Sequence, residues 1–389
     1  MEIKVPGVNV VDNRIISVND MVESAVPLFI GFTQKRTSLS AVFISSLSDY
    51  EINFGGQHAG DAILYYAIKH FFDNGGVSGY VFSLGSYDEF ETLTSFDICN
   101  LLQSKELSHT VAAEQSITLL AFPDCIVIPN DDIYSWHKVW DRLIALAGAR
   151  SGIFAILDAP GDPHNAAKCI SNYSGNEPQY GAAWWPYLVT SYLKDNSPIV
   201  ITPSASVIAA IQVKDASHGV WSAPANVSLV KVIRPLYSWL EGHHFSDENC
   251  QALNIIRSFP GKGTRIWGCR TLTQDIDSQY RYVQIRRFIS WCEKNITDVC
   301  RMFLFEPNNE ITWYKLKGVI TNWLRKVWYQ GGLYGVHESD AFQVLLGIDE
   351  SMSEIDILDG RLVIIIKLAV LYPAEFINLT IDLKMNAVQ

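Results

Sequence analysis

The sequence predicts an α/β chain that continues into a smaller α+β region and carries an extended β-arm at each end. Three observations predict this class. Strand-like apolar runs alternate with helical patterns in the first half of the chain, a hairpin and two long helical patterns occupy the second half, and apolar segments without a helical period form both ends. Because strands that alternate with helices usually run parallel, we expect a parallel sheet covered on both faces.

Residues 1–22 are expected to form the N-terminal arm. β-branched residues dominate this segment, Pro6 and Gly7 prevent a helix, and no turn signal returns the chain to a nearby partner strand. An apolar strand that stays unpaired promotes aggregation, so we expect the arm to insert into a partner. The side chains expected to make this contact are Val5, Val8, Val10, Ile15, Ile16 and Val18.

Residues 23–250 are expected to form the α/β domain. Its clearest helix lies at 60–74, where aromatic and aliphatic residues recur at three-to-four spacing and a following Gly-Gly pair can end the helix. The expected elements, in chain order, are a strand at 25–32, the helix at 60–74, strands at 79–84 and 118–122, a helix around 139–149 and a strand at 152–157.

Residues 251–372 are expected to form the second, α+β domain. The Pro-Gly-Lys-Gly sequence at 260–263 is a strong turn signal that joins two apolar runs into a hairpin. The expected elements, in chain order, are hairpin strands at 254–259 and 264–267, helices at 286–299 and 310–330, and strands at 342–346 and 361–371.

Residues 373–389 are expected to form the C-terminal arm. The segment is apolar and has no clear helical pattern; its packing residues are Phe376, Leu379, Ile381 and Leu383. With an apolar arm at each end, we expect the chain to insert both arms into neighbouring molecules.

The charge and the aromatic content exclude several classes of protein. Of the 389 residues 12% are aromatic and 18% are charged, which excludes intrinsic disorder. Thirty basic and 41 acidic residues give a net charge of −11, so we expect no nucleic-acid partner and no direct membrane insertion. Few charges together with many aromatic residues indicate surface that is buried in an assembly.

No cofactor-binding or metal-binding constellation is predicted. The Gly-Lys-Gly-Thr sequence at 261–264 lacks the spacing of a phosphate loop and is better explained as a hairpin turn. His337-Glu338 lacks the second histidine of a zinc protease motif because residue 341 is Ala. The pair His243-His244 has no further ligand cluster in the sequence.

No catalytic residue is predicted either. Ser204, Asp158 and His164 can imitate a nucleophile with its partners, but Ser204 as a helix cap explains the same pattern without chemistry. An α/β hydrolase-like enzyme with Asp158, Asp162 and His164 at a strand end stays an alternative. A non-contractile capsid or scaffold protein is the other alternative.

Several short stretches along the chain carry a family resemblance when taken together. They include Val-Pro-Gly-Val at 5–8, Asn-Phe-Gly-Gly at 53–56 and Phe-Glu-Pro-Asn at 305–308. The others lie at 25–32, 67–76, 219–226, 257–272, 282–287, 359–362 and 372–376. In this order, they resemble the contractile tail sheath family of phage tails, pyocins and extracellular contractile injection systems.

The resemblance implies a fold and a mechanical function. The fold would be a subtilisin-like α/β domain without catalytic residues and a C-terminal sheath domain. The subunit would polymerise as stacked hexameric rings around an inner tube and contract to drive the tube through a target envelope. It would be no enzyme and hold no cofactor.

The resemblance also implies partners and contact residues. The partners would be further copies of the chain, an inner tube protein, baseplate and terminator or cap proteins, and sheath paralogues. The particle would assemble in a bacterial cytoplasm and be released outside the cell. The arms would pair with a neighbour's strand through Leu362, Ile364, Ile366 and Leu368, while Arg286, Arg287 and Lys294 would face the tube.

Overall fold

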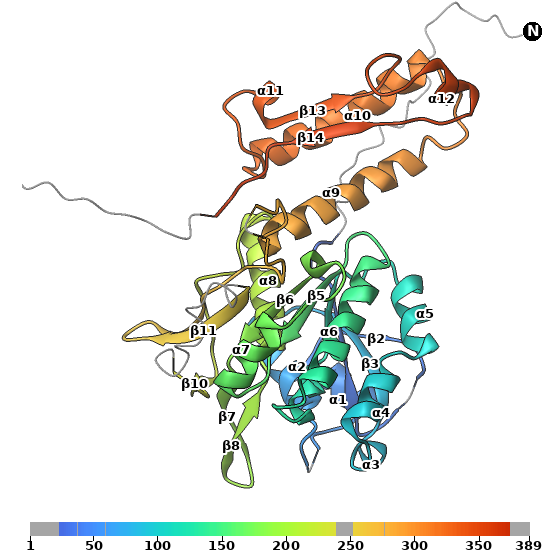
Figure 1. Ribbon diagram of the computed structural model, residues 1–389. Coiled ribbons are helices and arrows are strands. Elements are labelled where there is room, and N and C mark those ends of the chain that lie inside the picture. Colours follow the sequence, from blue (N-terminus) through green and yellow to red (C-terminus); the bar gives the residue numbers. More distant parts are fainter. Residues whose placement is uncertain (1–22, 37, 59, 239–251, 276, 374–389) are drawn as a thin grey trace, which may run out of the picture.

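The computed structural model describes residues 23–36, 38–58, 60–238, 252–275 and 277–373 (Figure 1). The residues expected to form the two arms, 1–22 and 374–389, lie outside the described residues, and so does the pair His243-His244. Two layers are visible, an α/β body and a C-terminal layer that joins it through one long helix.

A nine-stranded sheet is the centre of the α/β body, with the strand order β2-β3-β1-β4-β5-β6-β11-β12-β9. The six strands from β3 to β11 in that order pair in parallel, which confirms the predicted parallel sheet. The strands are β1 (Pro27–Thr33), β2 (Val42–Ile44), β3 (Gly79–Ser86), β4 (Leu119–Ala121), β5 (Phe154–Asp158), β6 (Gly181–Trp185), β9 (Val227–Ser228), β11 (Leu253–Phe259) and β12 (Gly263–Ile266).

Helices cover both faces of this sheet, so its central strands β1, β4, β5 and β6 are buried on both sides. In β1, Leu28 and Ile30 face one core and Phe29 faces the other, because side chains alternate along a strand. One face carries α3 (Tyr87–Phe90), α4 (Ser95–Leu101), α5 (Lys105–Ala113), α6 (Ile133–Gly148) and α7 (Pro163–Ser171), and the other carries α1 (Leu47–Phe54), α2 (Leu64–Asp73) and α8 (Ser204–His218). Two short 3-10 turns, Pro123–Val127 and Pro178–Tyr180, complete the connections.

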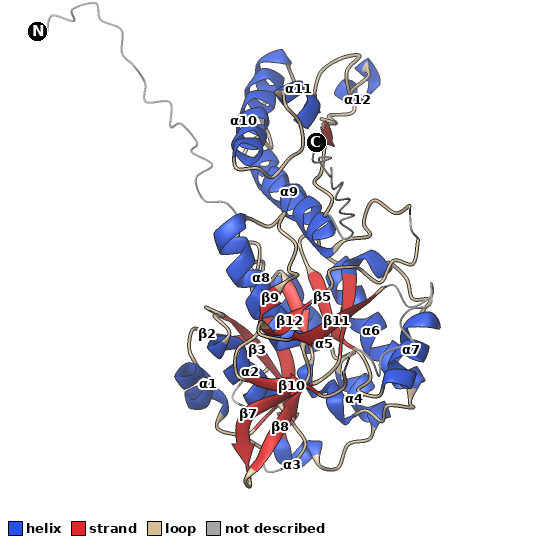
Figure 2. Cartoon of the chain, turned by 90° about the vertical axis from the view of Figure 1, so that its left-hand side faces the viewer, coloured by secondary structure: helices blue, strands red, loops and turns tan. Residues whose placement is uncertain are grey.

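A small antiparallel sheet lies beside the body, with the order β10-β7-β8. Its strands are β7 (Leu188–Lys194), β8 (Ser197–Ile201) and β10 (Val232–Pro235). Figure 2 shows β7 and β8 below the hairpin of β11 and β12. The sequence patterns did not predict this sheet.

The C-terminal layer has a core of its own. Its elements are α9 (Val283–Arg301), α10 (Glu310–Tyr329), α11 (Glu338–Ala341), β13 (Phe342–Leu345), α12 (Glu354–Leu358) and β14 (Ile365–Leu368). The apolar face predicted for 310–330 is buried in this core, with Trp323, Leu324 and Val327 at most 3% exposed. No helix among the described residues is long and apolar enough to cross a membrane.

The hairpin predicted at 254–267 is present but belongs to the large sheet. β11 pairs with β12, as predicted, and also in parallel with β6, where Leu253 lies opposite Ala183. The expected boundary at residues 250 and 251 therefore precedes two strands of the α/β body. By its core, the C-terminal layer begins with α9.

Candidate assembly site

The strands β13 and β14 form a separate two-stranded antiparallel sheet. Exposure alternates along 361–368: Leu362, Ile364, Ile366 and Leu368 pack against the C-terminal core, while the residues between them are exposed. All four predicted acceptor residues thus point their side chains to one face, although the strand itself covers only 365–368. The sheet has two strands among the described residues, so each has an outer edge.

The hydrogen-bonding pattern shows which backbone groups lie on that edge. The N–H of Ala369 donates to the carbonyl of Ala341 at 2.9 Å, and the register continues with Gln343 opposite Lys367. Backbone groups in an antiparallel ladder point to the partner strand at every second residue. The N–H groups of Ile366 and Leu368 therefore point away from β13.

The first described residues of the chain are held where α8 and α9 meet. The guanidinium of Arg287 donates to both carboxylate oxygens of Asp215, at 3.1 and 2.6 Å, and to the Ser24 carbonyl at 2.8 Å. The Ser24 hydroxyl donates to Asp215 at 2.5 Å. Gln212 adds a bond from its amide to the Ala25 carbonyl at 2.8 Å. This clasp fixes the point from which the predicted N-terminal arm leaves the body.

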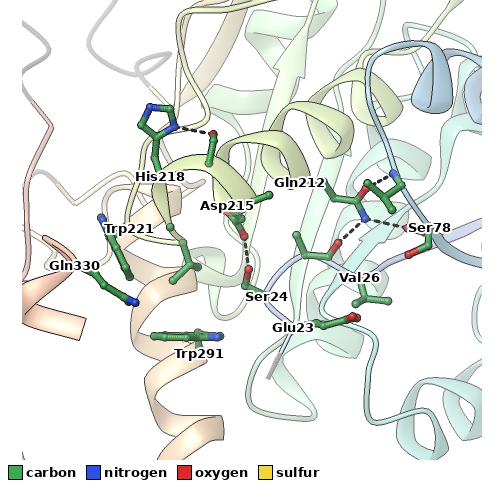
Figure 3. Close-up of a pocket in the computed structure, with 16 residues that line it drawn as sticks. Glu23, Ser24, Val26, Ser78, Gln212, Asp215, His218, Trp221, Trp291 and Gln330 are labelled. Atoms are coloured by element: carbon green, nitrogen blue, oxygen red, sulfur yellow. Dashed lines mark hydrogen bonds between the residues drawn. The ribbon is translucent and has the colours of Figure 1, made fainter. Parts of the chain in front are cut away.

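A groove of about 670 Å³ opens beside the clasp (Figure 3). Trp221, Trp291 and Gln330 line one side of it and Glu23 and Val26 the other. The groove separates the start of the α/β body from the C-terminal layer, so its walls come from both layers.

The three residues expected to face an inner tube lie against the chain itself. Arg286 and Arg287 are 3% and 5% exposed, and Arg286 lies against the rings of Tyr180 and Tyr280. Lys294 is half-buried, and its ammonium donates to the Gln115 carbonyl at 2.6 Å. Desolvation lowers the pKa of Lys294. Arg286 and Arg287 both bind carboxylates inside the subunit, and that these three residues face a tube stays a prediction.

The enzyme alternative placed Asp158 at a strand end, and the structure encloses that residue. Asp158 is 3% exposed, and its carboxylate accepts the backbone N–H of Ser204 at 2.8 Å and contacts Cys125 Sγ at 3.8 Å. Burial raises the pKa of Asp158 to about 7. A carboxylate surrounded in this way has no open side toward a substrate.

Ser204 is not the cap of its helix, contrary to the prediction. Helix α8 begins at Ser204 after Pro203, which makes no side-chain cap bond, and Asp158 supplies the missing acceptor from β5. Asp162 is an ordinary N-cap that accepts the N–H of Asn165 at 2.9 Å. Two of the three residues of the enzyme alternative thus have structural roles.

Asp124 caps α2 in the same remote manner. One carboxylate oxygen accepts the N–H groups of Ile63 and Leu64 at 2.6 and 2.9 Å, and the other accepts that of Phe32 at 2.7 Å. Burial raises the pKa of Asp124 to about 6. Both buried aspartates therefore hold helices onto one face of the sheet.

Known proteins that are similar in sequence and in structure identify the family of this chain. The model of the phage tail sheath C-terminal domain matches residues 275–384. A tail sheath protein of Vibrio phage KVP40 is 26% identical over 216 residues, which are 54% of this chain and 31% of the phage protein. This chain thus aligns to about a third of the length of that curated relative.

Solved structures match over nearly the full length. The PVC sheath complex of an extracellular contractile injection system, in its contracted state, contains a chain 27% identical with a TM-score of 0.73, and the match covers 98% of both chains. The baseplate of the anti-feeding prophage, also contracted, contains a chain 36% identical with a TM-score of 0.88. That match covers 98% of this chain and 99% of the other.

The chain belongs to the contractile tail sheath family. The resemblance predicted from short stretches of the sequence is confirmed, and so is the mixed α/β class. As a member of this family the chain is a structural sheath subunit, and the enzyme alternative is not favoured. The clasp, the groove and the open sheet edges are therefore features of a protein that works by assembly.

Proposed function

We propose that this sheath subunit polymerises by strand exchange at the β13–β14 sheet. The observation that carries the proposal is the open edge of β14, with outward N–H groups and an apolar face turned to the core. In the C-terminal arm, Leu379, Ile381 and Leu383 recur with the same period of two. A neighbour's arm added to this edge would continue both the ladder and the apolar face.

The polymer formed in this way would be a stack of hexameric rings around an inner tube. Main-chain hydrogen bonds between arms and strands hold neighbours together whatever the angle between their bodies. The bodies can then rotate as the sheath shortens and drives the tube into a target envelope. Baseplate and terminator proteins would bind the two ends of the sheath, and sheath paralogues would share its lattice.

We further propose the identity of the α/β body, the place where the particle assembles and the source of energy for contraction. The α/β body would be the subtilisin-like domain of the family, without its catalytic chemistry. The particle would assemble in a bacterial cytoplasm and act outside the cell. Energy for contraction would be stored in the extended polymer, with no nucleotide and no cofactor.

Negative-stain electron microscopy of the purified full chain tests strand exchange. The full chain should form long hollow tubes, whereas deletion of residues 1–18 should leave soluble subunits. Closed shells would indicate the scaffold alternative, and normal tubes from the deletion would overturn the arm model.

A single substitution tests the acceptor edge separately. Ile366→Pro removes an outward N–H and leaves the β13 ladder intact, so tubes should be lost while the circular dichroism spectrum stays unchanged. Ile366→Val keeps the N–H and the apolar contact and should form normal tubes. Tubes formed by the proline variant would show that β14 accepts no strand.

A further inference from the structure

Exposed apolar side chains gather at the far end of the C-terminal layer. This surface, named here the acidic tip, comprises residues 302–311 and 349–361, and a hydrogen bond from Asn308 Nδ2 to the Arg361 carbonyl at 3.1 Å joins its two segments. The tip carries seven acidic residues and one basic residue. Its exposed apolar side chains are Met302, Leu304, Phe305, Ile311, Ile355 and Leu358.

Phe305 has the most unusual environment on the tip. Its φ is 70°, and its side chain is fully exposed. A bulky residue in the left-handed region stores about 1–3 kcal/mol of strain. In the free subunit, no burial of the Phe305 side chain offsets this strain. The exposed ring is therefore suited to be an anchor residue that a partner buries.

A surface of opposite charge lies where the edge of the large sheet meets β10 of the small sheet. This surface, named here the basic edge, comprises residues 226–235 and 253–267, from β9, β10 and the β11–β12 hairpin. These residues include five basic and no acidic side chains, in a chain of net charge −11. Val230, Ile233 and Trp267 are about half exposed among them, at 50%, 57% and 47%.

The hairpin of the basic edge is stiffened by its own contacts. Trp267 packs on Phe259 with ring centroids 4.6 Å apart, and the Arg257 guanidinium lies 4.6 Å from the Phe259 ring. Arg265 donates to the carbonyl and the side chain of Asn226, both at 3.0 Å. The exposed ammonium of Lys262 is therefore presented at the end of an ordered hairpin.

We propose that the acidic tip of one subunit docks on the basic edge of a second copy of this chain. Charge complementarity selects the partner, because both surfaces combine exposed apolar groups with a strong excess of one sign of charge. The hairpin and the tip lie on opposite sides of the molecule (Figure 1), so one subunit cannot join its own two surfaces.

A contact between two different surfaces has a consequence for the assembly. Each subunit then offers one free tip and one free edge, and the contact repeats from copy to copy as a closed ring or an open helix. This inference rests on the polymer proposed above. It adds a side-chain interface that does not involve either arm.

Carbodiimide cross-linking tests the contact, because it joins a lysine to a carboxylate that lies against it. Full-length protein is prepared with natural and with heavy nitrogen, mixed and cross-linked, so that mass spectrometry separates links between copies from links within one. Links are expected between Lys231 or Lys262 and Glu306 or Glu354. Wild-type protein without such mixed-isotope links, or with lysine links to another surface, would overturn the inference.

Charge reversal gives a matched test. Lys231→Glu with Lys262→Glu, and separately Glu306→Lys with Glu354→Lys, should each reduce the links at least tenfold, whereas a mixture of the two variants should restore them. Lys105→Glu makes the same change on exposed α5 and should leave the links unchanged. Unchanged links in both reversed variants would count against the contact.

The outcomes separate this contact from strand exchange. Normal tubes without edge-to-tip links would overturn the contact and leave strand exchange standing. Edge-to-tip links in full-length protein that forms no tubes would support the contact and oppose the proposed polymer.

Discussion

Arg287 and Asp215 form a bidentate ion pair inside the subunit, with N–O distances of 3.1 and 2.6 Å. The two side chains are 3% and 6% exposed, so the pair is almost removed from water. Arg287 lies on α9 and Asp215 on α8, and both bind Ser24 at the start of the described chain. One ion pair therefore links the body, the C-terminal layer and the root of the predicted N-terminal arm.

Arg287→Met should destabilise the subunit by about 3–5 kcal/mol, because it leaves the Asp215 charge buried without its partner. Denaturant unfolding measures this loss. Combining Arg287→Met with Asp215→Leu should recover most of it, since no uncompensated charge remains. The more exposed pair of Arg325 and Glu338, whose side chains are 38% and 37% exposed, provides the control, and Arg325→Met should cost far less than Arg287→Met. Equal losses in the free energy of unfolding for Arg287→Met and Arg325→Met would show that burial of the ion pair does not determine the loss.

Asp158→Asn should change how stability depends on pH. Burial raises the pKa of Asp158 in the folded chain to about 7, from an ordinary value of 3.8. Its protonated form therefore stabilises the fold fully below pH 3.8, and this contribution is lost as the pH rises through 7. Asn keeps an acceptor for the Ser204 N–H and carries no charge. The free energy of unfolding of the variant, relative to that of wild type, should therefore rise by about 1.4 kcal/mol for each pH unit across this window.

Urea unfolding of the two proteins between pH 4 and 8 measures that gain. Asp97→Asn is the matched control, because Asp97 caps α4 at the surface and hydrogen bonds from Thr94 lower its pKa. A lowered pKa means that the contribution of the ionised form is fully present above pH 3.8 and is lost only below it, so the Asp97 variant should differ from wild type by a nearly constant amount between pH 4 and 8. A flat difference for Asp158→Asn would show that its carboxyl ionises normally in the fold.

Sequence periodicity predicted the elements that are determined by residues close together in the sequence. The helix at 310–330 and the hairpin at 254–267 appear where the apolar spacing and the Pro-Gly turn placed them. The large parallel sheet follows from the order of strands and helices, and the family follows from short stretches distributed along the chain. These features depend on neighbours in the sequence.

Remote side-chain contacts were beyond sequence reasoning. Asp158 caps a helix that begins 46 residues later, and Asp124 caps one that begins 60 residues earlier. Nothing in the local pattern separates these aspartates from turn residues. The buried ion pair of Arg287 was not predicted for the same reason, since its partner Asp215 lies 72 residues away.

Gly31→Ala should destabilise the α/β body. A Cβ at Gly31 would lie 2.5 Å from Asp124 Oδ2 and 3.0 Å from a Leu64 methyl group, so the carboxylate that caps α2 would have to move. Overpacking of this kind costs about 1–3 kcal/mol, and thermal unfolding measures it. The same substitution at Gly318, inside α10 with nothing within 4 Å of the added carbon, should instead stabilise by about 1 kcal/mol. If both glycine variants were stabilised, or both destabilised, this explanation would be contradicted.

Phe305→Asn should stabilise the isolated subunit while weakening its assembly. Asn tolerates a φ of 70°, and the exposed phenyl ring contributes no packing, so the substitution should gain about 1 kcal/mol in thermal or denaturant unfolding. The same substitution at Tyr314, an exposed aromatic residue within α10, relieves no strain and should cost a few tenths of a kcal/mol. If Phe305 anchors the acidic tip on a neighbour, the more stable variant should also lose the edge-to-tip cross-links, because its anchor is gone. A stabilised variant with undiminished cross-links would mean that the strain at Phe305 serves something other than this contact.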